Sequence, residues 1–381
     1  MSASKKPAVD GRIIQGFDET IGNPETAGKW TQTFDRKIRV GIAGYGVCNF
    51  GGAFQFQDHP NVTIAAVCDL APDRCREMAK VCRCEKTYPS VDEMVKDDAI
   101  EAVFVATAAP SHAANCITAL KHGKHVASAV PAVFGSIEDA QELFEAVKAS
   151  GRKYMMFETS AFYPECYAMR QIYRAGGFGK LVYSEGEYYH DACARIASFR
   201  DWRIGMPPQW YSTHSNAFYV CVSGGSFTEV SCMGMPSIYK ELRPENNRYK
   251  NPFGTEIALM RTSEGGMARM AVSWDTPGHE PLTGRVRGQR GSMTGMKYEG
   301  QEKNLPSLEK PPLPPAIAEG HHGGSSGYLT NEFIMAILED RQPLVDVVHA
   351  LNMTVAGIVA HQSALKDGEL MKIPQFQRSK S

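Results

Sequence analysis

The 381-residue sequence predicts an α/β protein in two parts, a doubly wound parallel sheet followed by an α+β domain with a mostly antiparallel, open sheet. Three observations predict this arrangement. An apolar run near the start ends in closely spaced glycines, apolar runs alternate with helix-like segments as far as residue 158, and strand-like alternation dominates afterwards. Buried strands alternating with amphipathic helices are typical of parallel sheets, whereas strands grouped together are typical of α+β domains.

The glycines follow the apolar run 38–43 as Gly44-x-Gly46. At such a turn, glycines let the backbone approach a pyrophosphate at the N-terminus of a helix, as in Rossmann dinucleotide-binding units. Asn49 occupies the third glycine position of that fingerprint, so the helix must pack differently or begin later. We expect a dinucleotide to contact Gly44, Gly46, Val47 and Cys48.

A second apolar run, 62–68, ends at Asp69, 23 residues after Gly46. The ribose-binding acid of a Rossmann unit stands at about this distance. A carboxylate there accepts hydrogen bonds from the ribose hydroxyls and repels a 2′-phosphate, so it favours NAD over NADP, although nearby Arg74 leaves room for the latter. The alternative is that Asp69 only caps the following helix.

The remaining elements of the first part follow in order. We expect strands at 38–43, 63–68, 102–107, 125–130 and 154–157, and helices over 71–81, 91–96, 113–122 and 137–149. Ligands of open parallel sheets bind beyond the carboxyl ends of the strands. Thr107 and His112 follow one predicted strand end and Val130 and Pro131 the next, so we expect all four near the cofactor.

The second part begins after residue 158. We expect strands at 181–189, 256–260 and 267–274, with a hairpin turn at 264–266, and helices over 329–339 and 345–365. The proline-rich segment 311–315 predicts an extended surface crossing. The expected divisions are an arm at 1–36, a cofactor-binding domain at 37–158 and a substrate-binding domain at 159–381.

Charge and cysteine usage limit the function. The 41 basic and 42 acidic residues give a formal net charge of −1, and no basic block suggests nucleic acid or an anionic membrane as partner. Residues 1–37 lack an apolar run that could serve as a signal-peptide core or membrane span, and we expect a surface arm or one that crosses a subunit boundary. The ten cysteines include one close pair, Cys82 and Cys84, whose spacing suits neither zinc nor a redox motif. We therefore expect small-molecule chemistry in the cytoplasm, without a metal.

From residue 37 onward the chain resembles the Gfo/Idh/MocA oxidoreductase family. The matching features are the Gly44-x-Gly46 turn, Asp69, the segment 105–107 with His112, and the segment 121–126 that leads into the fourth strand. The resemblance implies NAD as cofactor and a sugar as substrate. It also implies a homo-oligomer, a dimer or tetramer, because the exposed face of the family's second sheet commonly pairs between subunits.

One departure from that family bears on the chemistry. Most of its sugar dehydrogenases carry Glu-Lys-Pro after the fourth strand, and the lysine helps to transfer the hydroxyl proton. This chain has Ala129-Val130-Pro131 instead. Either the enzyme does not oxidise a hydroxyl, or another residue takes the proton.

Two segments, 187–191 and 210–214, look like motifs of the NAD-dependent redox glycosidases in this superfamily, typified by the α-N-acetylgalactosaminidases. That group also has a tripeptide ending in Val-Pro, a Tyr-Pro-Thr-His motif, in which Ser212 replaces proline here, and a Gly-His-Gly-Gly segment similar to 321–324. The resemblance implies oxidation of a glycoside at carbon 3, elimination of the glycosidic oxygen, addition of water and re-reduction. Paired carboxylates are not required, unlike in ordinary glycosidases.

Such a cycle needs proton carriers near neutrality, and histidine suits this role. His214 is the first candidate for acid–base catalysis, Tyr211 or Tyr188 the alternative relay, and His190 with Asp191 a supporting or substrate-binding pair. The competing interpretation makes them structural residues beneath the sheet. Further candidates for sugar contact are the stacking aromatics Trp202 and Trp210, with core packing favoured for Phe218 and Tyr219, and His321 and His322 on a glycine-rich substrate loop rather than as metal ligands.

Two alternative functions stay open. The first is a plain NAD(P)-dependent sugar or inositol dehydrogenase in which His214 replaces the lysine. The second is a cofactor-bound sensor or scaffold that has lost catalysis together with the lysine.

Overall fold

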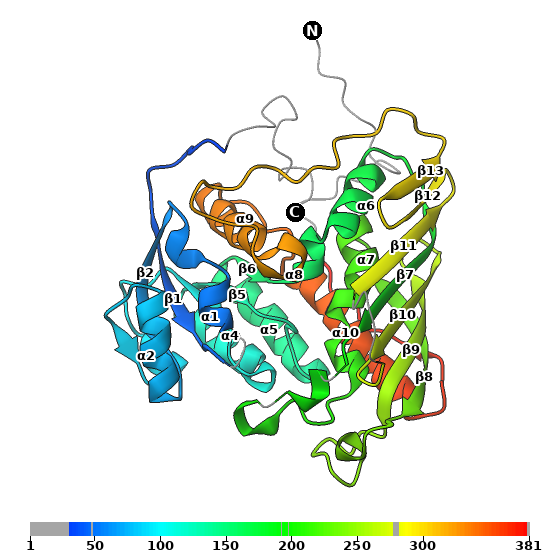
Figure 1. Cartoon of the computed structure of the whole chain (residues 1–381), viewed down its shortest axis with the longest axis horizontal. Helices are drawn as coiled ribbons and strands as arrows, with labels where there is room; N and C mark the ends of the chain where they lie inside the picture. The colour runs from blue at the N-terminus through cyan, green and yellow to red at the C-terminus, as the bar shows by residue number, and fades with distance from the viewer. Residues whose placement is uncertain (1–29, 47–48, 192, 197, 277–281, 379–381) are drawn as a thin grey trace.

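The computed structural model describes residues 30–46, 49–191, 193–196, 198–276 and 282–378. These residues form two sheets with helices between them (Figure 1). The first sheet has six strands in the order β3-β2-β1-β4-β5-β6, and every pair in it is parallel. Its strands are β1 (Ile38–Ala43), β2 (Val62–Cys68), β3 (Thr87–Tyr88), β4 (Ala102–Val105), β5 (His125–Ser128) and β6 (Tyr154–Met156). The predicted doubly wound parallel sheet is confirmed.

Helices follow the strands of this sheet, as the alternating pattern predicts. They are α1 (Phe50–Ala53), α2 (Pro72–Val81), α3 (Val91–Met94), α4 (His112–Lys121) and α5 (Ile137–Ser150). Local sequence sets the ends of α5, where the Ser136 side chain accepts a hydrogen bond from the Asp139 N–H and Gly151 adopts φ 63° after the last turn. The two-residue strand β3 was not predicted, because so short a segment has no readable alternation.

The second sheet has eight strands in the order β13-β12-β11-β7-β10-β9-β8-β14. All its pairs are antiparallel except β7 with β10, so the predicted mostly antiparallel sheet is confirmed. Its strands are β7 (Leu181–Tyr189), β8 (Phe227–Pro236), β9 (Phe253–Thr262), β10 (Met267–Ser273), β11 (Leu282–Gly288), β12 (Gly291–Thr294), β13 (Lys297–Gly300) and β14 (Met371–Lys372). In Figure 1 the large helices cover one face of this sheet and leave the other uncovered.

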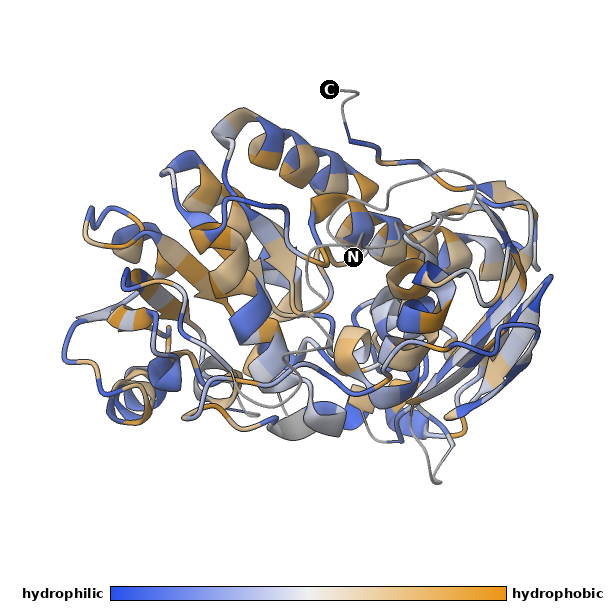
Figure 2. Ribbon diagram, turned by 90° about the horizontal axis from the view of Figure 1, so that it is seen from above, coloured by the Kyte–Doolittle hydropathy of each residue, from blue (hydrophilic) through white to orange (hydrophobic). Residues whose placement is uncertain are grey.

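Four helices fill the space between the sheets: α6 (Pro164–Arg174), α7 (Thr213–Ser223), α9 (Ser326–Leu338) and α10 (Val347–Ala364). Every residue of α7 is buried, so the segment lacks the polar face by which a helix is read from sequence. Helix α9 joins the two parts, because Phe333 packs against Phe56 and Phe157 of the first. Figure 2 shows apolar residues concentrated in these helices and in the parallel strands.

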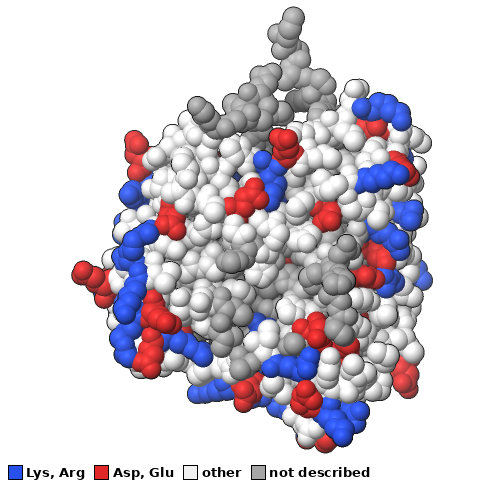
Figure 3. Space-filling view, in the orientation of Figure 1, with Lys and Arg blue, Asp and Glu red and all other residues white. Residues whose placement is uncertain are grey.

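The predicted N-terminal arm lies almost entirely outside the described residues, which begin at Trp30. The proline-rich segment 311–315 contains neither helix nor strand, as predicted. Among the described residues, no helix combines the length and apolar character needed to cross a membrane. On the face shown in Figure 3, charged side chains of both signs are interspersed.

Candidate active site

The glycine turn after β1 lies against the neighbouring strand end. Gly44 has φ 90°, and a Cβ added there would come within 2.6 Å of the Ala106 carbonyl oxygen. Only glycine fits this position, because it lacks the Cβ and tolerates the left-handed backbone. A Cβ at Gly46 would meet open space, so the turn presents bare backbone to a cavity. Val47 and Cys48 fall outside the described residues.

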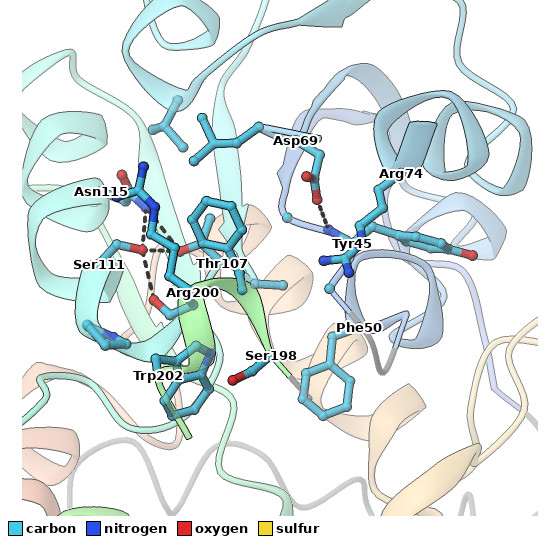
Figure 4. A pocket seen from close by; sticks show the side chains of 18 of the residues that line it. Tyr45, Phe50, Asp69, Arg74, Thr107, Ser111, Asn115, Ser198, Arg200 and Trp202 are labelled. Atoms are coloured by element: carbon cyan, nitrogen blue, oxygen red, sulfur yellow. Dashed lines mark hydrogen bonds between the residues drawn. The ribbon is translucent and has the colours of Figure 1, made fainter. Parts of the chain in front are cut away.

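A cavity of about 480 Å³ opens beyond these strand ends. Gly44, Gly46, Asp69, Arg74 and Thr107 all line it, so five predicted cofactor residues lie together (Figure 4). The bare glycine backbone, the carboxylate and an arginine form a cradle that fits a dinucleotide, with its pyrophosphate at the turn and its ribose near the acid.

The Asp69 carboxylate has two backbone contacts of its own. It accepts hydrogen bonds from the Tyr45 N–H and the Ala71 N–H, both at 2.8 Å. Asp69 therefore fixes the glycine turn and the loop that leads into α2. It is not the N-cap of that helix, because Ala71 occupies the N-cap and no side chain caps the first turn. Each carboxylate oxygen accepts one of these bonds and can accept another, and Asp69 lines the cavity where a ribose hydroxyl could donate it.

His112, Val130 and Pro131 lie behind this cavity, not on its wall. The buried His112 ring has Nδ1 2.8 Å from the Pro131 carbonyl oxygen and Nε2 3.0 Å from that of Thr107. Burial lowers the pKa of His112 despite these two acceptors. The histidine thus braces the loops after β4 and β5 against one another, and Val130-Pro131 is a cis peptide.

His214 lies in the first turn of α7 and pairs with a carboxylate from the other part of the chain. Its Nδ1 is 2.6 Å from Glu158 Oε1, just beyond β6, and 3.4 Å from Ser160 Oγ. Glu158 is fully buried and His214 is 6 % exposed. Burial raises the pKa of Glu158, but the attraction and hydrogen bonds of His214 outweigh it and hold that pKa below its usual value. Within the described part of the chain, no group hydrogen-bonds Nε2 of His214, so this nitrogen can face a substrate.

Two tyrosines stand beside this histidine. The ring centroid of Tyr188, near the end of β7, is 4.5 Å from that of His214, and Tyr211 lies 5.9 Å from it. Burial raises the pKa of Tyr211 to about 12 and also raises the pKa of Tyr188 well above its ordinary value. Both phenols therefore carry their protons at neutral pH and can donate them. Trp274, fully buried, packs edge-on against both rings.

The other candidates are spread around this centre. His190 contacts Tyr188 edge-on, with its Nδ1 3.0 Å from the Asp191 carbonyl oxygen. Asp191 accepts a hydrogen bond from Tyr239 Oη at 3.0 Å and pairs with Arg195, so its carboxylate is already engaged.

The remaining candidates, the two tryptophans and the two histidines of the glycine-rich loop, lie in different parts of the structure. Trp202 lines the cavity, whereas Trp210 packs against Phe134 and His361. The backbone of His321 lies in α8 (His321–Gly324), and the His322 ring contacts that of Phe50, which also lines the cavity. Phe218 and Tyr219 are fully buried, as the core interpretation predicts. Within the described segments, no three His, Cys, Asp or Glu side chains gather as metal ligands would.

Sequence reasoning missed two residues of this centre. Glu158 could have been found as an acid that directly follows a buried apolar run, where active-site groups of parallel sheets stand. Arg203, buried, has its guanidinium 4.5 Å above the ring of Trp202 and 5.7 Å from that of Tyr211. No local signal in the sequence marks this arginine as buried.

The chain is similar to known proteins in sequence and in fold. A Glycosyl hydrolase family 109 protein of Solibacter usitatus is 24 % identical over 393 residues, which cover 90 % of this chain and 89 % of that protein. An Alpha-N-acetylgalactosaminidase of Bacteroides fragilis is 27 % identical over 161 residues, covering 40 % of this chain and 37 % of the relative.

Among solved structures, levoglucosan dehydrogenase in complex with NADH and levoglucosan superposes with a TM-score of 0.73 at 19 % identity, over 89 % of this chain and all of that one. Scyllo-inositol dehydrogenase from Lactobacillus casei with bound NAD(H) and scyllo-inositol superposes with a TM-score of 0.69 at 18 % identity, over 88 % of this chain and 99 % of that one. Both share the two-part fold.

Residues 38–158 match the sequence model of the Gfo/Idh/MocA oxidoreductases, described as an oxidoreductase family with an NAD-binding Rossmann fold. The match spans the parallel sheet and the glycine turn, and it confirms the predicted NAD cofactor and the predicted resemblance. Residues 38–158 therefore form an NAD-binding Rossmann domain of the kind found in the Gfo/Idh/MocA oxidoreductases.

Proposed function

We propose that the protein is an NAD-dependent carbohydrate-active enzyme that cleaves a glycoside by transient oxidation at carbon 3. The observation that carries the proposal is the buried Glu158–His214 pair beside Tyr188 and Tyr211, in a chain without the family's usual lysine. The relatives named for glycosyl hydrolase family 109 support the same activity.

Each residue has a separate task in this proposal. Glu158 accepts the Nδ1 proton of His214 in a hydrogen bond, which fixes the ring and leaves Nε2 as the base for the sugar hydroxyl proton. Bound NAD would supply the hydride acceptor for the oxidation and the hydride donor for the later re-reduction. Gly44, Gly46 and Asp69 would hold the cofactor.

The elimination step needs a base and an acid. The ketone at carbon 3 acidifies the proton on carbon 2. Once His214 has passed the hydroxyl proton to solvent, its Nε2 takes this second proton, a carbon–carbon double bond forms and the bond to the glycosidic oxygen breaks. Tyr188 and Tyr211 suit the acid, because their raised pKa values keep the phenols protonated, and either can donate to the departing oxygen. Water then adds to the double bond: its hydroxide bonds to carbon 1, its proton restores the tyrosine, and His214 returns the proton to carbon 2. The hydride returned to carbon 3 and a proton from solvent then restore the hydroxyl.

A panel of aryl glycosides tests the proposal. We expect release of the phenol without net NADH, because the cofactor ends each cycle as it began. NADH accumulating in proportion to substrate with no phenol release would refute it and favour the second candidate, a sugar or inositol dehydrogenase. That candidate is supported by the likeness in fold to the levoglucosan and scyllo-inositol dehydrogenases. NAD binding without turnover of any sugar would favour a sensor.

We also propose a homo-oligomer, a dimer or tetramer, in the cytoplasm, with domains divided at residue 158. The uncovered face of the second sheet supports the oligomer, because five of its apolar side chains are 38–64 % exposed. They are Met233, Met235, Ile257, Leu259 and Met267. The nine cysteines in the described segments are all free thiols, which is typical of a reducing compartment.

A further inference from the structure

Residues 198–203 of the second part, here named the strap, reach across to the cofactor cavity. Ser198, Phe199, Arg200, Trp202 and Arg203 line the same cavity as the glycine turn. Figure 4 shows Arg200 and Trp202 of the strap on the same side as Thr107, Ser111 and Asn115, with Asp69 and Arg74 across from them. The nucleotide site therefore has a wall that does not come from the Rossmann domain.

Contacts from both parts of the chain hold the strap in place. The Trp202 ring packs edge-on against Phe134 of the first part, with centroids 5.5 Å apart. Tyr249 Oη donates to the Trp202 carbonyl oxygen at 2.5 Å, and the Arg248 guanidinium donates to the carbonyl oxygen of Arg200. These contacts position the strap without any help from a ligand.

The side chains that the strap presents suit a dinucleotide. Phe199 is 38 % exposed and Leu70, on the opposite domain, is 63 % exposed, although both line the cavity. Such apolar surface is unfavourable in water and gains free energy when a flat heteroaromatic ring covers it.

The charge of the residues that line the cavity also suits a dinucleotide. Four arginines line it, Arg74, Arg200, Arg203 and Arg248, against two acids, Asp69 and Asp92. Two of these cations, Arg200 and Arg248, are exposed and project from the second part. A diphosphate with two negative charges matches this excess of positive charge.

We propose that the strap is a clamp that retains NAD between turnovers, in which Phe199 and Leu70 contact the adenine and Arg200 and Arg248 stabilise the diphosphate. The proposal rests on the proposed function, because a cofactor that is oxidised and reduced within one cycle must not leave midway. A clamp from the second part slows departure, since the strap must move before the nucleotide can leave.

The dissociation rate of NADH tests the clamp without any substrate. The full-length protein is loaded with NADH and mixed with excess NAD in a stopped-flow instrument while NADH fluorescence is followed. We expect Arg200→Ala and Phe199→Ala each to raise the rate about 10- to 100-fold, the effect of losing one charged or apolar contact. Arg200→Lys should raise it less. Arg243→Ala should leave it unchanged, because Arg243 is an exposed arginine of the segment between β8 and β9 that also carries Arg248, but it does not line the cavity.

The outcomes separate the clamp from the proposed function. Unchanged dissociation in both alanine variants, with wild-type melting temperatures, would overturn the clamp. Tighter binding in Phe199→Ala would overturn it too, because the ring would then occupy the place of the cofactor. Aryl glycoside cleavage is scored independently: cleavage with unchanged dissociation refutes only the clamp, and faster dissociation in a protein that cleaves no glycoside refutes only the glycosidase activity.

Discussion

At the scale of single residues, the Glu158–His214 pair decides whether the centre is catalytic. His214→Ala should lower turnover about 10²–10⁴-fold, the usual contribution of a positioned acid or base. NAD affinity should change little, because the glycine turn and Asp69 lie in the other domain. The single-turnover rate, the NAD affinity and the melting temperature of His214→Ala are measured and compared with those of the wild type.

Glu158→Gln tests the other member of the same pair. It keeps the shape of the side chain but replaces the carboxylate that accepts from His214. If His214 is the base, Glu158→Gln should shift the pH profile of turnover as well as its maximum. A His214→Ala protein with near-wild-type turnover would remove the histidine from the mechanism and direct attention to Tyr188 or Tyr211.

Asp69 has two roles that one substitution can separate. Asp69→Ala removes an acceptor from the ribose and a negative charge that would repel a 2′-phosphate. We expect NAD binding to weaken about 10- to 100-fold, the effect of one charged hydrogen bond, and discrimination against NADP to relax. Titration with both cofactors measures this. Equal weakening for both would mean that Asp69 acts only through the Tyr45 and Ala71 backbone.

At the scale of elements, the close approach of α7 to β7 positions His214. Gly186 of β7 faces α7, and a Cβ there would overlap the Ser215 carbonyl oxygen, which is backbone and cannot rotate away. Gly186→Ala should therefore destabilise the fold by about 1–3 kcal/mol, as overpacking does, and displace the helix start. Denaturant unfolding and turnover measure the effect. Val182→Ala on the same strand, whose side chain is exposed, is the control, and equal stability of the two variants would contradict the argument.

At the scale of the whole molecule, histidines with lowered pKa values make stability depend on pH. Besides His112 they are the buried His59 and the half-buried His125. Burial lowers the pKa of His59 and of His125 to about 4, and Nδ1 of each accepts a backbone N–H, from Asn61 and Lys153 respectively. The unfolded chain binds protons at about pH 6.5, whereas the folded chain binds them only near pH 4, so stability falls as pH drops through this interval.

Melting temperature measured between pH 7 and about 5.5 tests this, because that interval lies above the ordinary pKa values of carboxylates. His59→Gln should flatten the decline, because it removes one of these groups. The same slope in the variant and the wild type would mean that His59 does not contribute.

The oligomer is also a property of the whole molecule. Leu259 and Ile257 stand on the uncovered face of the second sheet, so Leu259→Lys places a charge on the proposed interface. We expect the mass measured by light scattering to fall towards that of one chain, 41.9 kDa, with NAD affinity retained. Val81→Lys, whose exposed side chain lies on α2 of the first part, should not change the mass.

Much of the fold was determined by the sequence alone, because local patterns carry it. Alternating apolar runs and helices specify the parallel sheet, and the Gly44 turn with Asp69 marks the nucleotide site within one βαβ unit. Helix α7 escaped prediction because it is buried on all sides, and β3 because it is too short.

Only the tertiary structure decided the composition of the site. His214 was a candidate from its motif, but its partner Glu158 lies 56 residues away in sequence, and nothing in the pattern joins them. The strap reaches the nucleotide cavity for a similar reason, since its place depends on how the two sheets pack. Strand and helix periodicity is set by neighbouring residues, whereas the pairing of side chains across two domains is set by packing between distant segments, which sequence spacing does not encode.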